Sequence, residues 1–367
     1  MSDGLESETC FFVLCFFVMI RLLTQLVMTK TAPEFARNLC ARYLDAYTTF
    51  QWHKHVTHVP VEDPVEVMGL RFPNRIGIAA GFDRNGEMVS ALGALGVGHV
   101  EIGTVTPVAQ PGNPLPRVAR LSATEAVVNR VGNASDGCEH VLRNLKSADA
   151  FKLRGGILGV NIGKNATTPI ESAVGDFRIA LAKLYDRADY FTVNISSPNT
   201  KRLGELQKSR ELLTLLTELD DERTRLQEDQ SLPYRPIAVK LSADLDTDDL
   251  YRALESIVNA KMDAVIVSNT SAVLGRQIQE ERPFAEGGIS GAPLMARSTK
   301  LVRDCVQYLQ GRLPVIASGG VVSPEDAVTK IEAGADLVQI HTGLFYHGLG
   351  LPADCVDAVA KLRKSSR

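Results

Sequence analysis

Neutral amide and hydroxyl side chains form the most informative chemical pattern in this 367-residue sequence. They follow short apolar runs, most densely in NISSPNT (194–200) and at Ser268, Asn269 and Thr270, and Lys240 ends another such run. Because an amide donates and accepts hydrogen bonds at once, this set suits a planar ring that carries imide groups. A hydrolase would more naturally show paired carboxylates or a His/Asp base beside a nucleophile, and neither is gathered here.

Two glycine-containing ends, at 318–320 and 341–343, predict a phosphate-bearing ligand. Glycine lets backbone N–H groups close around an anion. A pair of glycines more often marks a simple turn, but these ends follow the last two apolar runs, where (β/α) barrels usually bind phosphate.

Eight β-rich runs alternate with amphipathic helical patterns, for example at 171–188 and 323–335. This repeat predicts an α/β fold, a (β/α)8 TIM barrel over residues 67–367, with its chemistry at the carboxyl ends of the strands. An open doubly wound sheet is the alternative, but no G-x-G-x-x-G follows the first run. The runs are 75–80, 97–103, 157–162, 190–195, 236–241, 264–268, 314–318 and 337–341.

The N-terminal segments differ from the rest of the chain. Residues 10–28 are almost wholly apolar and approach the length of a membrane-spanning helix, so residues 1–28 are predicted to be a membrane anchor. A secretory signal would begin with basic residues, whereas this chain has Asp3, Glu6 and Glu8. Residues 29–66 are expected to form a short amphipathic helix and a linker, with an apolar face for the bilayer surface or the barrel.

Composition excludes several function classes. The net charge is −3 and no long basic run occurs, so no nucleic acid partner is expected. Six scattered cysteines argue against a disulfide framework or a structural zinc site and favour a reducing compartment. We expect no metal, since His53, His55 and His58 lack a carboxylate or cysteine at ligand spacing.

Taken in order, these strand ends resemble the membrane-bound, quinone-reducing class of dihydroorotate dehydrogenases. The resemblance begins near Thr31, covers nearly all of the remaining chain and is carried by AAGFDRNGE (79–87), EIGTVTP (101–107), NISSPNT and AGADLVQIHTG (333–343). It implies FMN-dependent oxidation of dihydroorotate to orotate with ubiquinone as the electron acceptor, in de novo pyrimidine biosynthesis. It also implies a membrane partner through residues 10–28 and a location in the inner mitochondrial membrane.

The resemblance assigns roles residue by residue. It makes Ser197 the catalytic base and places Arg37 and Arg120 along a quinone tunnel. The residues implied for FMN are Ala80, Gly81, Thr104, Asn129, Asn161, Asn194, Lys240, Ser268, Ser290, Gly291, Gly319, Gly320, His341 and Thr342. Those implied for the substrate are Arg84, Asn129, Arg130, Val131, Gly132, Asn133, Asn194, Asn199, Asn269 and Thr270.

The chemistry of the reaction agrees with these roles. Oxidation removes a proton from C5 and a hydride from C6, so a base must face the flavin across the substrate. Ser197 is the base only if it is buried and connected to a proton acceptor, with Thr200 as a neighbour in that path. Lys240 would stabilise the charge that develops on the flavin. The alternative for 196–199 is an ordinary turn, because these residue types favour turns.

Four positions depart from the family pattern. This chain has Arg84 where the family has lysine, Asn133 where it has phenylalanine, His341 where it has tyrosine, and Arg37 where it has histidine. Arginine has a wide planar fork that does not replace an ammonium group. One hypothesis is therefore an active enzyme with an adjusted site. A second is a catalytically weakened paralogue that binds flavin or orotate, and a third is an FMN barrel that acts on another substrate.

Overall fold

The computed structural model describes residues 62–199, 203–208, 211–279, 281–284 and 286–365. The predicted anchor and residues 29–61 of the amphipathic segment lie outside this range. Within the described part of the chain, no helix is both long and apolar enough to cross a membrane.

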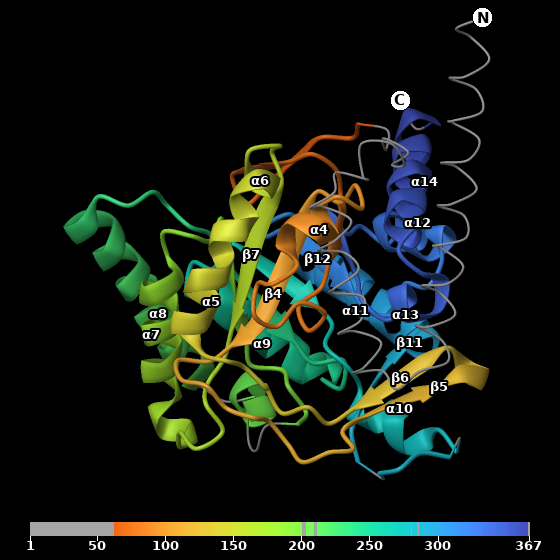
Figure 1. Cartoon of the computed structure of the whole chain (residues 1–367), viewed down its shortest axis with the longest axis horizontal. Helices are drawn as coiled ribbons and strands as arrows, with labels where there is room; N and C mark the ends of the chain where they lie inside the picture. The colour runs from red at the N-terminus through yellow and green to blue at the C-terminus, as the bar shows by residue number, and fades with distance from the viewer. Residues whose placement is uncertain (1–61, 200–202, 209–210, 280, 285, 366–367) are drawn as a thin grey trace, which may run out of the picture.

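A closed barrel of eight parallel strands confirms the predicted fold (Figure 1). Each strand corresponds to one predicted run, and the last strand, β13, pairs with the first, β3. In chain order the strands are β3 (Ile76–Ile78), β4 (His99–Val105), β7 (Ile157–Ile162), β8 (Tyr190–Asn194), β9 (Ile237–Leu241), β10 (Ala264–Val267), β12 (Val315–Ser318) and β13 (Leu337–Ile340).

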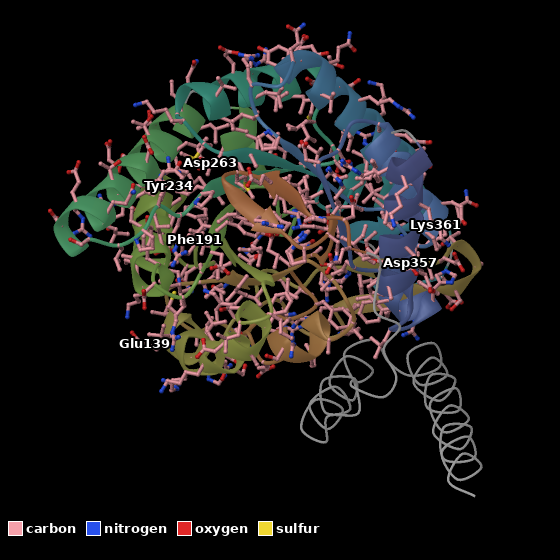
Figure 2. The ribbon with its side chains drawn as sticks, turned by 90° about the horizontal axis from the view of Figure 1, so that it is seen from above. Glu139, Phe191, Tyr234, Asp263, Asp357 and Lys361 are labelled. Carbon is pink, nitrogen blue, oxygen red and sulfur yellow. The ribbon has the colours of Figure 1, made fainter. Side chains whose placement is uncertain are left out.

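Helices surround the barrel and cover the apolar outer side of its strands (Figure 2). Their starts follow local sequence chemistry: Ser323 and Asp326 form a capping box, and the side chain of Asp246 caps the helix that begins at Thr247. The helices are α4 (Val89–Gly93), α5 (Cys138–Asn144), α6 (Asp149–Lys152), α7 (Ala173–Leu184), α8 (Glu211–Gln230), α9 (Thr247–Asn259), α10 (Ala272–Gln277), α11 (Met295–Leu309), α12 (Pro324–Glu332), α13 (Gly343–His347) and α14 (Leu351–Ser365).

Two small antiparallel sheets lie at opposite ends of the barrel (Figure 1). The hairpin of β1 (Val65–Val67) and β2 (Leu70–Phe72) packs Phe72 onto an apolar layer of strand starts that includes Ala238 and Ile266. At the other end, β5 (Val118–Leu121), β6 (Ala126–Asn129) and β11 (Gly288–Gly291) form a three-stranded sheet. Neither sheet is among the elements expected from the sequence.

The barrel interior is apolar at its base and polar above it. Because successive strand residues point to opposite sides, Glu101 and Thr192 point inward while their neighbours join the outer core. Gly159 leaves the space that Tyr190 fills, since a Cβ atom there would lie 2.2 Å from Cζ of the Tyr190 ring. A layer of buried polar side chains therefore lies under the carboxyl ends of the strands.

Candidate active site

One cavity opens at the carboxyl ends of the strands and is covered by the β5–β6–β11 sheet. It brings together most of the residues that the sequence singles out. Those lining it are Ala80, Gly81, Arg84, Thr104, Asn129, Val131, Gly132, Asn133, Asn161, Asn194, Ser197, Asn199, Lys240, Ser268, Asn269, Thr270, Ser290, Gly291, Gly319, Gly320, His341 and Thr342.

The asparagines at the strand ends hold one another in place. The amide of Asn194 donates to Thr104 Oγ1 (2.7 Å), which in turn donates to Asn161 Oδ1 (2.7 Å). On the other side, Ser196 Oγ donates to Asn194 Oδ1 (3.1 Å) and accepts from the amide of Asn269 (3.0 Å). This chain orients several amides toward the cavity before any ligand arrives.

Below these amides lies the carboxylate of Glu101, which is fully buried. Its Oε2 atom accepts hydrogen bonds from Tyr190 (3.0 Å), Thr192 (3.0 Å) and Gln339 (2.8 Å), and its Oε1 atom accepts one from Asn161 (2.9 Å). Four neutral donors thus stabilise one buried negative charge.

Lys240 lines the same cavity, and the residue is 6% exposed. Burial lowers its pKa, and the nearby Glu101 carboxylate acts in the opposite direction. In the part of the chain that the structure describes, Lys240 forms no hydrogen bond or ion pair through its ammonium group. Its positive charge therefore faces the cavity and is available to a ligand.

Ser197, Asn199 and Asn129 line the same cavity. The amide of Asn199 lies 3.1 Å from Asn129 Oδ1 and donates to it, while Ser197 Oγ accepts a weak hydrogen bond from the backbone N–H of Asn199 (3.4 Å). Ser197 is 6% exposed and borders the cavity. The loop is therefore a turn, as the alternative interpretation of 196–199 holds, but it presents Ser197 to the cavity.

His341 and Arg84 occupy the side near β3. His341 packs edge-on against Phe82, with ring centroids 6.1 Å apart, and contacts the space left by Gly81. Burial, with Lys240 and Arg84 as further causes, lowers the pKa of His341 to about 4. The imidazole is thus neutral at physiological pH. Asn133 adopts a positive φ of 53° and its amide nitrogen is buried without a partner.

Four predicted residues lie apart from this cavity or outside the described range. Arg130 follows β6 and turns away: its guanidinium donates to the carbonyl of Pro116 (3.2 Å) and lies 5.2 Å from the centre of the Phe284 ring. Arg120 shares the cavity-facing side of the sheet with Val118, but Val118 lines the cavity and Arg120 does not. Arg37 and Thr200, the expected neighbour of Ser197 in the proton path, lie outside the described residues.

Several lining residues were not predicted. Gln339 joins the Glu101 network, and the cavity has an apolar wall made of Val118 and Val127 from the sheet and Phe345 from α13. The sequence does carry a signal for Glu101 and Gln339. Each is a charged or amide side chain in the middle of an apolar strand, and such a residue is rarely buried unless it has a hydrogen-bonding partner.

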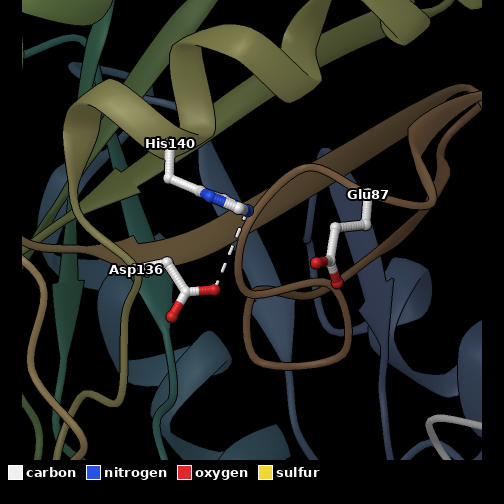
Figure 3. A group of neighbouring side chains, drawn as sticks. All are labelled: Glu87, Asp136 and His140. Atoms are coloured by element: carbon white, nitrogen blue, oxygen red, sulfur yellow. Dashed lines mark ion pairs between the residues drawn. The ribbon is translucent and has the colours of Figure 1, made fainter.

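A separate surface group comprises Glu87, Asp136 and His140 (Figure 3). Their ligand-capable atoms lie within 4.8 Å of one another, and Glu87 and Asp136 are exposed. Asp136 already accepts a hydrogen bond from the amide of Asn85 (2.7 Å) and pairs with His140 (3.8 Å). These contacts account for the cluster, and we assign no metal ion to it.

Comparison with known proteins identifies the family. Residues 64–362 match the family model described as dihydroorotate dehydrogenase. The chain belongs to the dihydroorotate dehydrogenase family. A curated relative from Herminiimonas arsenicoxydans, named dihydroorotate dehydrogenase (quinone), is 44% identical over 329 residues, which cover 89% of this chain and 94% of that protein. One of the same name from Nitrosomonas eutropha is 47% identical over 293 residues, covering 79% and 84%.

Solved structures agree with this assignment. The fold matches a crystal structure of DHODH from Eimeria tenella in complex with ferulenol, with a TM-score of 0.83, 32% identity, and coverage of 91% of this chain and 92% of that one. Dihydroorotate dehydrogenases are generally flavin-dependent, and the relatives give the hypothesis of a weakened paralogue no support. The expected mitochondrial location is wrong, because the curated relatives come from bacteria, which have no mitochondria.

Proposed function

We propose that this chain oxidises dihydroorotate to orotate, with FMN as its flavin and a quinone as the final electron acceptor, in pyrimidine biosynthesis. The observation that carries the proposal is the cavity itself. Its lining combines Ser197, the unpaired ammonium group of Lys240, and the amides of Asn129, Asn194 and Asn269.

The residues present fit FMN. Gly319 and Gly320 have φ values of 101° and 86°, and a Cβ atom at Gly320 would lie 2.3 Å from Met295 Cα, so the backbone forms a close-fitting cradle for a phosphate. The hydroxyl of Ser268 and Oε1 of Gln339 are buried without partners at the same cavity. Buried polar atoms need partners, and a flavin ring offers both donors and acceptors.

FMN would be held by the glycine cradle at its phosphate and by Lys240, Asn161, Thr104 and Ser268 around its ring. When bound, it supplies the hydride-accepting centre for the substrate C6 position. The rest of the reaction belongs to side chains of this chain. Asn129, Asn194, Asn199 and Asn269 orient the imide and carboxylate groups of dihydroorotate, since each presents a donor and an acceptor.

Ser197 removes the proton from substrate C5 in this assignment. A serine hydroxyl is a weak base, so its ability to accept the proton depends on burial and alignment rather than on its ordinary pKa. Lys240 stabilises the negative charge that accumulates on the ring system during hydride transfer, because it acts in a site shielded from water.

The direct test is anaerobic mixing of purified, flavin-loaded full-length protein with dihydroorotate. The flavin absorbance should bleach and should return when a soluble quinone is added. Orotate alone should shift the spectrum without bleaching it. Absence of bleaching by dihydroorotate, together with no spectral response at millimolar orotate, would sink the pyrimidine assignment.

We also propose that the apolar run at 10–28 anchors the chain to a membrane and that quinone approaches the apolar wall of Val118, Val127 and Phe345, beside Arg120. Deletion of residues 1–28 should leave a flavin-bound protein that still reduces a water-soluble dye with dihydroorotate. Reduction of a long-chain quinone in vesicles should fall by at least tenfold. If flavin is lost from the truncated protein, the segment belongs to the barrel core and is not an anchor.

A further inference from the structure

Lys330 is a fully buried lysine that the proposed reaction does not use. It lies on α12, which packs against α11, and its side chain is 0% exposed (Figure 1). Its ammonium group donates to Ser298 Oγ (2.6 Å) and Thr299 Oγ1 (2.7 Å), and more weakly to the carbonyl of Met295 (3.4 Å). Three N–H groups therefore meet three acceptors, all on the first turns of α11.

The same turns of α11 hold the glycine cradle. Ser298 Oγ lies 2.8 Å from the carbonyl oxygen of Gly319, 2.9 Å from that of Leu294 and 3.2 Å from that of Met295, and its one hydrogen can be donated to any of them. Met295 presses against Gly320, and Leu294, just before α11, fills the space beside Gly319 and lines the cavity. Lys330 is thus connected, through the hydroxyl of Ser298, to the backbone that would enclose the phosphate.

We propose that Lys330 is a positioning residue for the cofactor phosphate: its ammonium group keeps the Ser298 hydroxyl turned toward Gly319 and places a buried positive charge behind the glycine cradle. The proposal rests on the proposed FMN site. An ammonium group can only donate to Ser298 Oγ, so the Ser298 hydrogen remains available for a carbonyl acceptor, of which that of Gly319 is the nearest and that of Leu294 the competitor. A neutral amine can accept that hydrogen and release the carbonyl.

The charges around Lys330 make the Lys330–Ser298–Gly319 arrangement sensitive to pH. Burial lowers the pKa of Lys330 to about 7, opposed by Asp326 on its own helix and reinforced by Arg303 on α11. Asp326 is already occupied in capping α12, where it accepts from the backbone of Val322 and Ser323. A phosphate dianion at the cradle would favour the protonated lysine, and by linkage the protonated lysine would favour the phosphate.

The test compares FMN with riboflavin, which has the same ring without the phosphate. Dissociation constants of both are measured by flavin fluorescence quenching on deflavinated full-length protein between pH 6.5 and 9.0, where the FMN phosphate is mainly a dianion. We expect the preference for FMN over riboflavin to fall about tenfold as the pH rises through 7 to 8.5. In Lys330→Met the preference should be low and independent of pH, with riboflavin affinity unchanged.

Two further variants separate the charge from the hydrogen bond. Ser298→Ala keeps the charge, so it should retain the pH dependence with a weaker overall preference for FMN. Lys300→Met, on the exposed side of α11, is the matched control and should behave as the wild type. A pH-independent preference in the wild type, or the same pH dependence in Lys330→Met, overturns the inference. If FMN binding follows the expected pattern but dihydroorotate fails to reduce the flavin, the proposed function falls and this inference stands.

Discussion

Two adjacent serines, Ser196 and Ser197, have different tasks. The hydroxyl of Ser196 hydrogen-bonds to Asn194 and Asn269, whereas Ser197 borders the cavity and accepts a weak hydrogen bond from the backbone of Asn199. Replacing Ser197 with alanine should therefore leave flavin content unchanged and slow flavin reduction by dihydroorotate about 10²- to 10⁴-fold, the usual contribution of a positioned base. Stopped-flow absorbance measures this directly.

The half-buried Ser256 on α9, which does not line the cavity, gives the control variant Ser256→Ala, since its hydroxyl donates to the carbonyl of Arg252 within the same helix. It should reduce flavin at the wild-type rate. Equal rates for Ser197→Ala and wild type would remove Ser197 from its assigned role.

Glu101 tunes Lys240 from beneath the site. Its charge opposes the lowering of the Lys240 pKa by burial, so Glu101→Gln should lower that pKa further. Lys240 would then lose its proton at a lower pH, and the alkaline decline in flavin reduction should move to lower pH by about one unit. Thr192→Val, which removes one hydrogen bond to Glu101 but keeps its charge, is the control. A shift of equal size in both variants would mean that packing, rather than charge, is responsible.

Residues of the candidate site could be predicted from the sequence when they lie at the end of a strand, but not when they lie inside one. Strand ends carry polar residues in short, recognisable groups, so Asn161, Asn194 and Lys240 could be placed before the structure was known. Glu101 was missed because it lies mid-strand, where the pattern alone suggests burial. The family resemblance implied Arg130 as a substrate residue beside Asn129, but adjacent extended residues point in opposite directions, and only Asn129 lines the cavity.

At the scale of elements, the eight barrel strands were predicted and the two accessory sheets were not. Several barrel strands are equally short, but they lie in apolar runs, whereas most accessory strands, such as VEV, LRF, VARL and GISG, have polar residues or glycine among their few residues. Pairing between β6 and β11 also joins segments about 160 residues apart, which local sequence does not reveal. The accessory sheet nevertheless supplies Asn129, Ser290 and Gly291 to the cavity.

The β1–β2 hairpin closes the barrel on the side away from the cavity, and Phe72 is its fully buried anchor. Phe72→Ala should lower the free energy of unfolding by about 3–5 kcal/mol, the usual cost of an emptied aromatic site. The Michaelis constant for dihydroorotate should stay within twofold of wild type, because the change lies at the opposite end of the strands. Urea unfolding measures the change in stability, and steady-state kinetics measure the Michaelis constant. A large rise in the Michaelis constant would show that the hairpin shapes the site.

For the whole molecule, acid sensitivity is expected from histidines buried in the neutral form. His99 is fully buried inside the barrel, neither ring nitrogen has a partner, and burial lowers its pKa to about 3. The unfolded chain binds a proton near pH 6.5 while the native chain does not, so stability falls as the pH drops from about 6.5 toward 3. His99 alone should remove about 2 kcal/mol between pH 7 and pH 5.

Replacing His99 with leucine, an apolar side chain that needs no partner, should flatten this decline by that amount. The remaining loss of stability at acid pH should come from His341, whose pKa is lowered to about 4 by burial. Urea unfolding at pH 7 and pH 5 measures the difference, with the surface change His140→Gln as the control. Because His99 lies below the polar layer, flavin content should not change. If His99→Leu loses as much stability as wild type over this interval, the buried imidazole is not the source of the acid sensitivity, and the ionic contacts of the outer helices become its explanation.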